Sequence, residues 1–168
     1  NAVENSNSSD YRVDFTSTGF QVKTADVWLN ENSSTMIYMA FAGGMDSISD
    51  YNTTGSLDSR VKANPTYGQS IVSYVGNATA GATVGHGLSS APEMMIIKNR
   101  DQAVDWIAWH EALADDYHLR LHDTHAALNS STRFNSTDPS STVFTLGTQD
   151  DTNGSSKNMI AYCFHSVT

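Results

Sequence analysis

The chain has 168 residues and a formal net charge of −9, with nine lysines and arginines against 18 aspartates and glutamates. A chain of this length can form one domain, or one domain with part of a neighbour. Acidic charge without a basic cluster argues against binding to nucleic acid or to an anionic membrane surface. No apolar run approaches the length of about 18 residues that a membrane span requires. Cys163 is the single cysteine, which excludes an internal disulfide and a cysteine-based zinc site.

The first 45 residues alternate short apolar stretches with polar turns. Residues 11–15 alternate strictly between apolar and polar side chains, which predicts a strand. The other strands predicted here cover residues 20–22, 25–29 and 36–42. The chain begins with Asn1 rather than with methionine, and we expect a segment of a longer polypeptide. In this interpretation residues 1–45 form the C-terminal part of a preceding β module.

Residues 46–68 have a different character. Large apolar side chains are few, and glycine, asparagine, aspartate and threonine gather in residues 50–55. These residue types favour turns, as does the pair Asn64-Pro65. A structureless loop of this length would be unusual inside one compact domain. We therefore predict that residues 46–68 form a segment that connects two modules.

Residues 69–168 are predicted to form a complete β module. Two apolar runs, residues 93–98 and 159–164, are too short for buried helices and suit strands covered on both faces. Further strands are predicted over residues 70–75, 104–110, 117–121 and 142–146. Short strands at this spacing, without a long helical period, predict an all-β fold. We expect an antiparallel β-sandwich of the jelly-roll or lectin-like kind.

The strand-turn-strand pattern of residues 140–165 recurs near the start of the chain. The apolar run 159–164 corresponds to residues 36–41, and the polar turn before it corresponds to residues 30–34. A repeated unit at a domain-sized period indicates tandem β modules. We predict that residues 140–165 close the second module as a hairpin and that part of a similar module lies at the N-terminus.

The densest aromatic cluster is the candidate ligand site, formed by Trp106, Trp109, His110 and Tyr117. Successive residues of a strand face opposite sides, so Trp106 and His110 share one face while Trp109 lies on the other. One tryptophan is therefore expected in the core. The other is a candidate platform on which a sugar ring stacks.

Two clusters of polar residues could bind a metal ion, but the same residues are also typical of exposed surfaces and turns. One comprises His110, His118, His122 and His125 with Asp115, Asp116 and Asp123. A strand over residues 117–121 would hold His118 and His122 about 13 Å apart, too far to share an ion. The other cluster is the segment 150–154, whose oxygen atoms could bind calcium but are equally typical of turns. We predict no metal site and no cofactor.

No catalytic residues are predicted either. The sequence has no Gly-x-Ser-x-Gly nucleophile elbow, and no spaced acidic pair of the glycosidase type stands out. We expect that the chain is not an enzyme.

Several short motifs resemble a repeated module of marine bacteriophage structural proteins, in particular the tail fibres of cyanophages and their relatives. The resemblance covers residues 67–168, and residues 11–45 more loosely. The motifs are Val72-Ser73-Tyr74-Val75-Gly76-Asn77, residues 88–98, residues 105–113, residues 135–139, residues 141–147 and Tyr162-Cys163-Phe164. The family pattern contains no catalytic residues, so none are carried over.

The resemblance implies a β-rich protein on the virion surface that works in host attachment, and we expect a segment that adheres to a host-surface polymer or acts as a structural spacer. Fibres of this kind are commonly trimers, so we expect self-association, together with contacts to other virion proteins and to a host-surface glycan. Neither a nucleic-acid partner nor membrane insertion is expected. Two alternatives remain open: a self-assembling decoration or filament subunit without a ligand, and a secreted carbohydrate-binding module.

Overall fold

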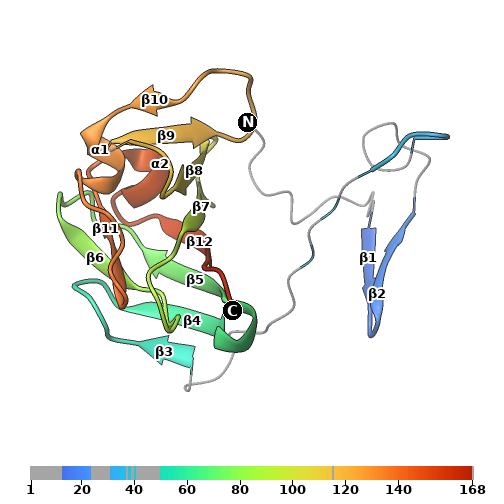
Figure 1. Cartoon of the computed structure of the whole chain (residues 1–168), viewed down its shortest axis with the longest axis horizontal. Coiled ribbons are helices and arrows are strands. Elements are labelled where there is room, and N and C mark those ends of the chain that lie inside the picture. Colours follow the sequence, from blue (N-terminus) through green and yellow to red (C-terminus); the bar gives the residue numbers. More distant parts are fainter. Residues whose placement is uncertain are drawn as a thin grey trace. The chain divides into compact units, whose positions relative to one another are not determined.

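The computed structural model describes residues 13–23, 31–36, 38, 40, 50–114 and 116–167. The chain divides into two compact units, one of Asn5–Ala42 and one of Asn1–Glu4 with Gly43–Thr168 (Figure 1). None of the helices in these described segments is long and apolar enough to cross a membrane.

The first unit contains a hairpin of β1 (Val13–Thr16) and β2 (Gly19–Val22). Val13 pairs with Val22 and Phe15 with Phe20, so four apolar side chains share one face of the hairpin. The ring of Tyr38 packs edge-on against Phe20, with 4.8 Å between the ring centroids. Phe15 is nevertheless 87% exposed, so this apolar face is incompletely covered.

The strands predicted over residues 11–15 and 20–22 are confirmed where the structure describes them. The predicted strand over residues 36–42 is not seen in its described residues, because Met36, Tyr38 and Ala40 belong to no strand. The remainder of that prediction, and the whole of residues 25–29, lies outside the described residues.

The second unit is built on an eight-stranded antiparallel sheet. The order across it is β10-β9-β8-β7-β12-β5-β4-β3. The bounds are β3 (Tyr51–Asn52), β4 (Ser59–Asn64), β5 (Gln69–Val75), β7 (Met94–Asn99), β8 (Trp106–His110), β9 (Tyr117–Arg120), β10 (Leu128–Asn129) and β12 (Asn158–Phe164). The last strand of the chain, β12, lies in the interior of the sheet between β5 and β7.

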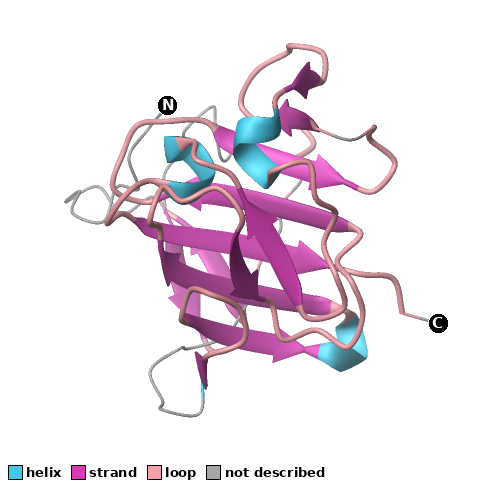
Figure 2. Cartoon of the chain, turned by 90° about the vertical axis from the view of Figure 1, so that its left-hand side faces the viewer, coloured by secondary structure: helices cyan, strands magenta, loops and turns pink. Residues whose placement is uncertain are grey.

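A second layer covers one face of this sheet. It consists of the pair β6 (Ala82–Gly85) and β11 (Val143–Leu146) together with α1 (Ser131–Phe134) and α2 (Asp150–Asn153). Figure 2 shows these elements in front of the eight-stranded sheet. A short 3-10 helix, η2 (Pro65–Tyr67), joins β4 to β5.

The hydrophobic core lies between the two layers. Tyr74 of the large sheet and Phe144 of β11 meet edge-to-face, with ring centroids 5.9 Å apart. The other buried members are Val72, Ala82, Val84, Leu88, Met95, Ile97, Ile107, Trp109, Phe134, Leu146, Met159, Ala161 and Cys163. Burial of these apolar side chains is the main term that stabilises the sandwich. The predicted all-β, antiparallel, sandwich-like fold is thus confirmed.

The prediction of a connecting segment over residues 46–68 was wrong for its described part. β4 pairs with β5 along its whole length, and β3 adds the edge strand. The inward positions of β4 carry only Ser59, Val61 and Ala63, so the strand lacks the large apolar side chains that reveal a strand in a sequence. Main-chain hydrogen bonding to β5, rather than hydrophobicity, places it in the sheet.

The predicted hairpin over residues 140–165 was also wrong, although both of its strands exist. β11 pairs with β6 in the covering layer, whereas β12 pairs with β5 and β7 in the large sheet. The polar stretch between them contains α2, whose residues Asp151, Thr152 and Asn153 are buried. Two strands that are adjacent in the sequence therefore lie in different layers.

A matched pair of phenylalanine substitutions tests the location of the core. Phe144 has no exposed surface and Phe15 is 87% exposed. Phe144→Ala should lower the free energy of unfolding by about 3–5 kcal/mol, because it leaves a cavity between the layers. In dilute, monomeric protein Phe15→Ala should change it by less than about 0.5 kcal/mol. Urea denaturation followed by tryptophan fluorescence measures both, and equal effects would contradict the assigned core.

Candidate functional site

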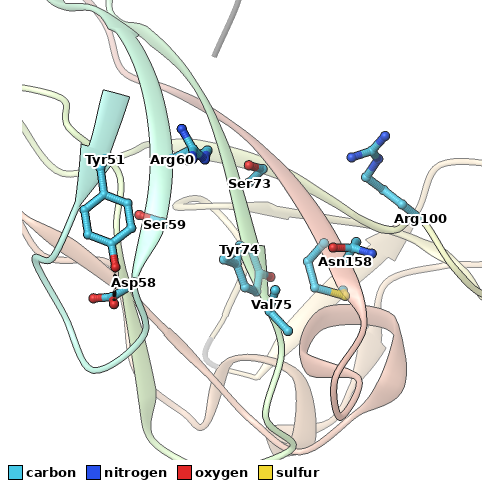
Figure 3. A pocket seen from close by; sticks show the side chains of 10 residues that line it. Tyr51, Asp58, Ser59, Arg60, Ser73, Tyr74, Val75, Arg100 and Asn158 are labelled. Carbon is cyan, nitrogen blue, oxygen red and sulfur yellow. Dashed lines mark hydrogen bonds between the residues drawn. The ribbon is translucent and has the colours of Figure 1, made fainter. Parts of the chain in front are cut away.

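A pocket of about 330 Å³ lies over β3, β4, β5 and β12 (Figure 3). Val72 and Tyr74 of β5 point into the core, so Ser73 and Val75 point to the opposite face of the large sheet. We call this opposite face, which β6 and β11 do not cover, the outer face. The residues that line the pocket are Tyr51, Asp58, Ser59, Arg60, Ser73, Tyr74, Val75, Arg100, Asn158 and Met159.

One wall of the pocket is formed by Tyr51, which is 52% exposed. Its hydroxyl donates a short hydrogen bond to the carboxylate of Asp58. This hydrogen bond raises the pKa of Tyr51 above its ordinary value. Tyr51 is also the direct cross-strand partner of Arg60. The hydrogen bond restrains an aromatic ring that would otherwise rotate freely at the sheet edge.

The floor of the pocket is rigid because its side chains are anchored on the core side. The hydroxyl of Tyr74 donates to the carbonyl oxygen of Thr152 at 2.6 Å. The hydroxyl of Ser59 donates to the carbonyl oxygen of Gly85 at 3.4 Å, and Met159 has no exposed surface. A site on such a floor changes little in shape when a ligand binds.

The far wall is formed by Asn158 and Arg100. The backbone N–H of Asn158 donates to Oδ2 of Asp101 at 2.7 Å, and the side-chain Nδ2 donates to both oxygens of the same carboxylate. These hydrogen bonds lower the pKa of Asp101. The backbone N–H of Arg100 donates to the carbonyl oxygen of Asn158 at 2.8 Å. The amide of Asn158 is therefore held with its oxygen able to accept a further hydrogen bond.

The pocket combines an exposed aromatic ring with several hydrogen-bonding groups around an ordered floor. A few placed polar groups beside an aromatic surface suit a small polar ligand with an apolar face, such as a sugar ring. In Figure 3 Tyr51 and Asp58 lie at one end and Arg100 at the other, with Ser73, Val75 and Asn158 between them.

A family model described as a domain of unknown function (DUF7483) matches residues 46–168. The chain belongs to this family. No curated protein and no solved structure matches the chain. The matched residues include β3 and β4, so the DUF7483 domain contains every strand that borders the pocket.

The structure does not bring the four predicted ligand-binding residues together. Trp109 is only 7% exposed and belongs to the core of the DUF7483 domain, which confirms that one tryptophan is internal. Trp106 and His110 lie on the outer face, four residues apart on β8 and thus about 13 Å apart. Nδ1 of His110 accepts a hydrogen bond from the N–H of Ala112 at 3.0 Å. Tyr117 is half-buried on the next strand.

The pocket residues were missed by sequence reasoning, mainly because four of them lie in the segment predicted as a connection. Tyr51, Asp58, Ser59 and Arg60 belong to β3, β4 and the turn between them. One signal was available, since residues 59–64 alternate between small inward and long polar outward side chains. Nothing in the sequence indicates that Arg100, at the end of β7, comes close to them.

The two polar clusters that were weighed as metal sites have other contacts in the DUF7483 domain. Arg133 of α1 binds Asp151 of α2 through Nε at 3.0 Å and Nη2 at 2.7 Å, both to Oδ2. Asp151 of the possible calcium segment thus forms an internal ion pair that links the two helices. Asp115 lies outside the described residues, and the described ones contain no group of three or more His, Cys, Asp or Glu residues placed to hold a metal ion.

His118 is the one histidine of that cluster that is fully buried, with 1% of its surface exposed. Neither ring nitrogen has a hydrogen-bond partner among the described residues. Burial is the largest cause that lowers the pKa of His118 to about 4, and the charge of Arg133 acts in the same direction. The imidazole is therefore neutral at physiological pH.

This buried imidazole should make the domain sensitive to acid. In the unfolded chain it titrates near its ordinary pKa of 6.5, whereas its folded pKa is about 4. Between these values the unfolded state binds more protons, so lowering the pH from 7 to 4 should cost up to roughly 3 kcal/mol of stability. His118→Leu should remove most of this loss in urea denaturation at pH 7 and 4.5.

The comparison with His118→Leu is needed because Asp151 has the opposite effect on how stability changes with pH. Burial raises the pKa of Asp151, so its protonation favours the folded state as the pH falls. Asp151 is present in both proteins, and the difference between their pH slopes isolates His118. Equal slopes would show that another group controls the acid sensitivity.

Proposed function

We propose that this chain is a non-enzymatic segment of a virion surface protein, of the tail-fibre kind, that attaches to a glycan of the host surface. The observation that carries the proposal is the pocket on the outer face, in which an oriented tyrosine stands beside hydroxyl, amide and guanidinium groups. Its phage origin is supported by the motifs of residues 67–168 that resemble marine phage fibre modules.

The chemistry of the pocket favours binding over catalysis. Among the described residues that line it, Asp58 is the single carboxylate, and it accepts a hydrogen bond from Tyr51, so these residues offer no second carboxylate for general acid and base roles. The same described residues include no cysteine or histidine. A ligand would be held by stacking and hydrogen bonds, without a metal or cofactor. A secreted carbohydrate-binding module would use the same pocket, so that alternative differs in origin rather than in chemistry.

The hairpin of the first unit favours a second role in assembly. A two-stranded hairpin is only marginally stable by itself, and the apolar face with Val13, Phe15, Phe20 and Val22 leaves Phe15 largely exposed. Covering this face with another copy would give a homo-oligomer, for which a trimer fits a fibre. The alternative of a decoration or filament subunit without a ligand rests on this observation.

A pair of tyrosine substitutions tests glycan binding. Tyr51→Ala removes the oriented ring, and Tyr67→Ala removes a 70% exposed tyrosine on η2 that does not line the pocket. Against an array of neutral and acidic bacterial surface oligosaccharides, Tyr51→Ala should weaken binding by about tenfold because stacking is lost. Tyr67→Ala should bind like the wild type. Failure of the wild-type chain to bind any glycan would refute the proposal.

The solution mass of the chain tests the assembly role. Light scattering over a range of protein concentrations should give a discrete trimer if the segment belongs to a fibre. Phe15→Ala should shift this equilibrium toward the monomer, because it reduces the apolar face that associates. Growth without a limiting mass would favour the filament alternative. A monomer at every concentration would argue against both forms of assembly.

A further inference from the structure

The described residues that line the pocket carry more positive than negative charge, unlike the chain as a whole, although the carboxylate of Asp101 adjoins the lining through its hydrogen bonds from Asn158. The chain has a net charge of −9, yet the pocket is lined by two guanidinium groups, Arg60 and Arg100, and by one carboxylate, Asp58. That carboxylate accepts the hydroxyl hydrogen bond of Tyr51. We propose that the pocket binds an acidic oligosaccharide, whose carboxylate or sulfate groups meet Arg60 and Arg100. This inference rests on the proposed glycan-binding function and specifies its ligand.

The spacing of the two arginines suits an oligosaccharide better than a single sugar. Arg60 is on β4 and Arg100 directly follows β7, with β5 and β12 between them. Three strand spacings of about 4.8 Å, with an offset of two residues along the strands, place their main chains about 16 Å apart. Figure 3 shows Ser73 and Asn158 along the path from Arg60 to Arg100. Acidic groups on separate sugar units can therefore reach one arginine each, while the units between them contact the neutral polar groups.

The side-chain type supports an anionic ligand. A planar guanidinium group binds an oxyanion through two parallel N–H donors, one to each of two charged oxygens, whereas a sugar hydroxyl offers a single neutral oxygen. Both arginines are exposed on the surface of the domain. Lys62 supplies an internal comparison, because it lies on the same strand and the same face but does not line the pocket. Its ammonium group is 3.7 Å from Oδ1 of Asp50.

Titration calorimetry with matched ligands tests the inference on the full chain. One pair of probes is an oligogalacturonate and its methyl ester, and the other is a sulfated galactan oligosaccharide and its desulfated form. At least one acidic probe should bind about tenfold more tightly than its neutral counterpart, and more weakly as salt is raised. The probe pair that shows the difference identifies the anion as carboxylate or sulfate.

Substitutions of the two arginines test whether the tighter binding of acidic probes takes place in the pocket. Arg60→Gln and Arg100→Gln should each weaken binding of the acidic probe by about tenfold while leaving the neutral probe unchanged. Lys62→Gln removes the same charge from the same strand and should have little effect. Equal binding of the acidic and neutral forms would overturn the acidic ligand but not glycan binding, provided that Tyr51→Ala still reduces it. Absence of binding to all four probes and to the wider array would overturn both.

Discussion

The hydrogen bonding of β12 on both of its sides is the constraint on which the second unit depends. This strand joins β5 to β7, so without it the large sheet would fall into two halves. Its side chains alternate between the core, where Met159 and Cys163 are fully buried, and the outer face. Arg60 and Arg100 come from opposite halves, which meet only through β12. The geometry of the pocket is therefore set by main-chain pairing rather than by loops.

Buried polar contacts hold the segment that leads into β12. The side-chain Nδ2 of Asn153 donates to the carbonyl oxygens of Gly147 at 2.7 Å and Thr79 at 3.2 Å, and its Oδ1 accepts from the N–H of Asn77 at 2.9 Å. Asn153 is fully buried, so each of these bonds would be costly to lose. Together with the ion pair between the helices, this network fixes the short α2. A helix of four residues has too few internal hydrogen bonds to persist alone.

Elements that bury apolar side chains leave a hydrophobic pattern in the sequence and could be predicted. Elements that are held by polar contacts leave no such pattern. Strongly apolar strands of the second unit, such as β7 and β12, could be predicted, because apolar side chains of this kind are buried in a folded protein. β4 and the two helices could not, since Ser59, Asp151 and Asn153 are buried for their hydrogen bonds or ion pair rather than for apolarity. The pocket combines residues from four separate stretches of chain, so its members could not be inferred from spacing. Aromatic density correctly indicated that one tryptophan, Trp109, belongs to the core, and a ligand-binding role for Trp106, His110 and Tyr117 stays a prediction.

The position of β12 has a consequence for synthesis of the protein. Strands β5 and β7 emerge from the ribosome long before their common partner, and both therefore present open edges and apolar side chains to the cell in the meantime. Such exposed edges pair readily with other chains, and pairings across so many residues form slowly. A nascent chain interrupted before residue 158 would be prone to aggregation. Pairing of β5 and β7 with their common partner is therefore completed only after β12 has been synthesised.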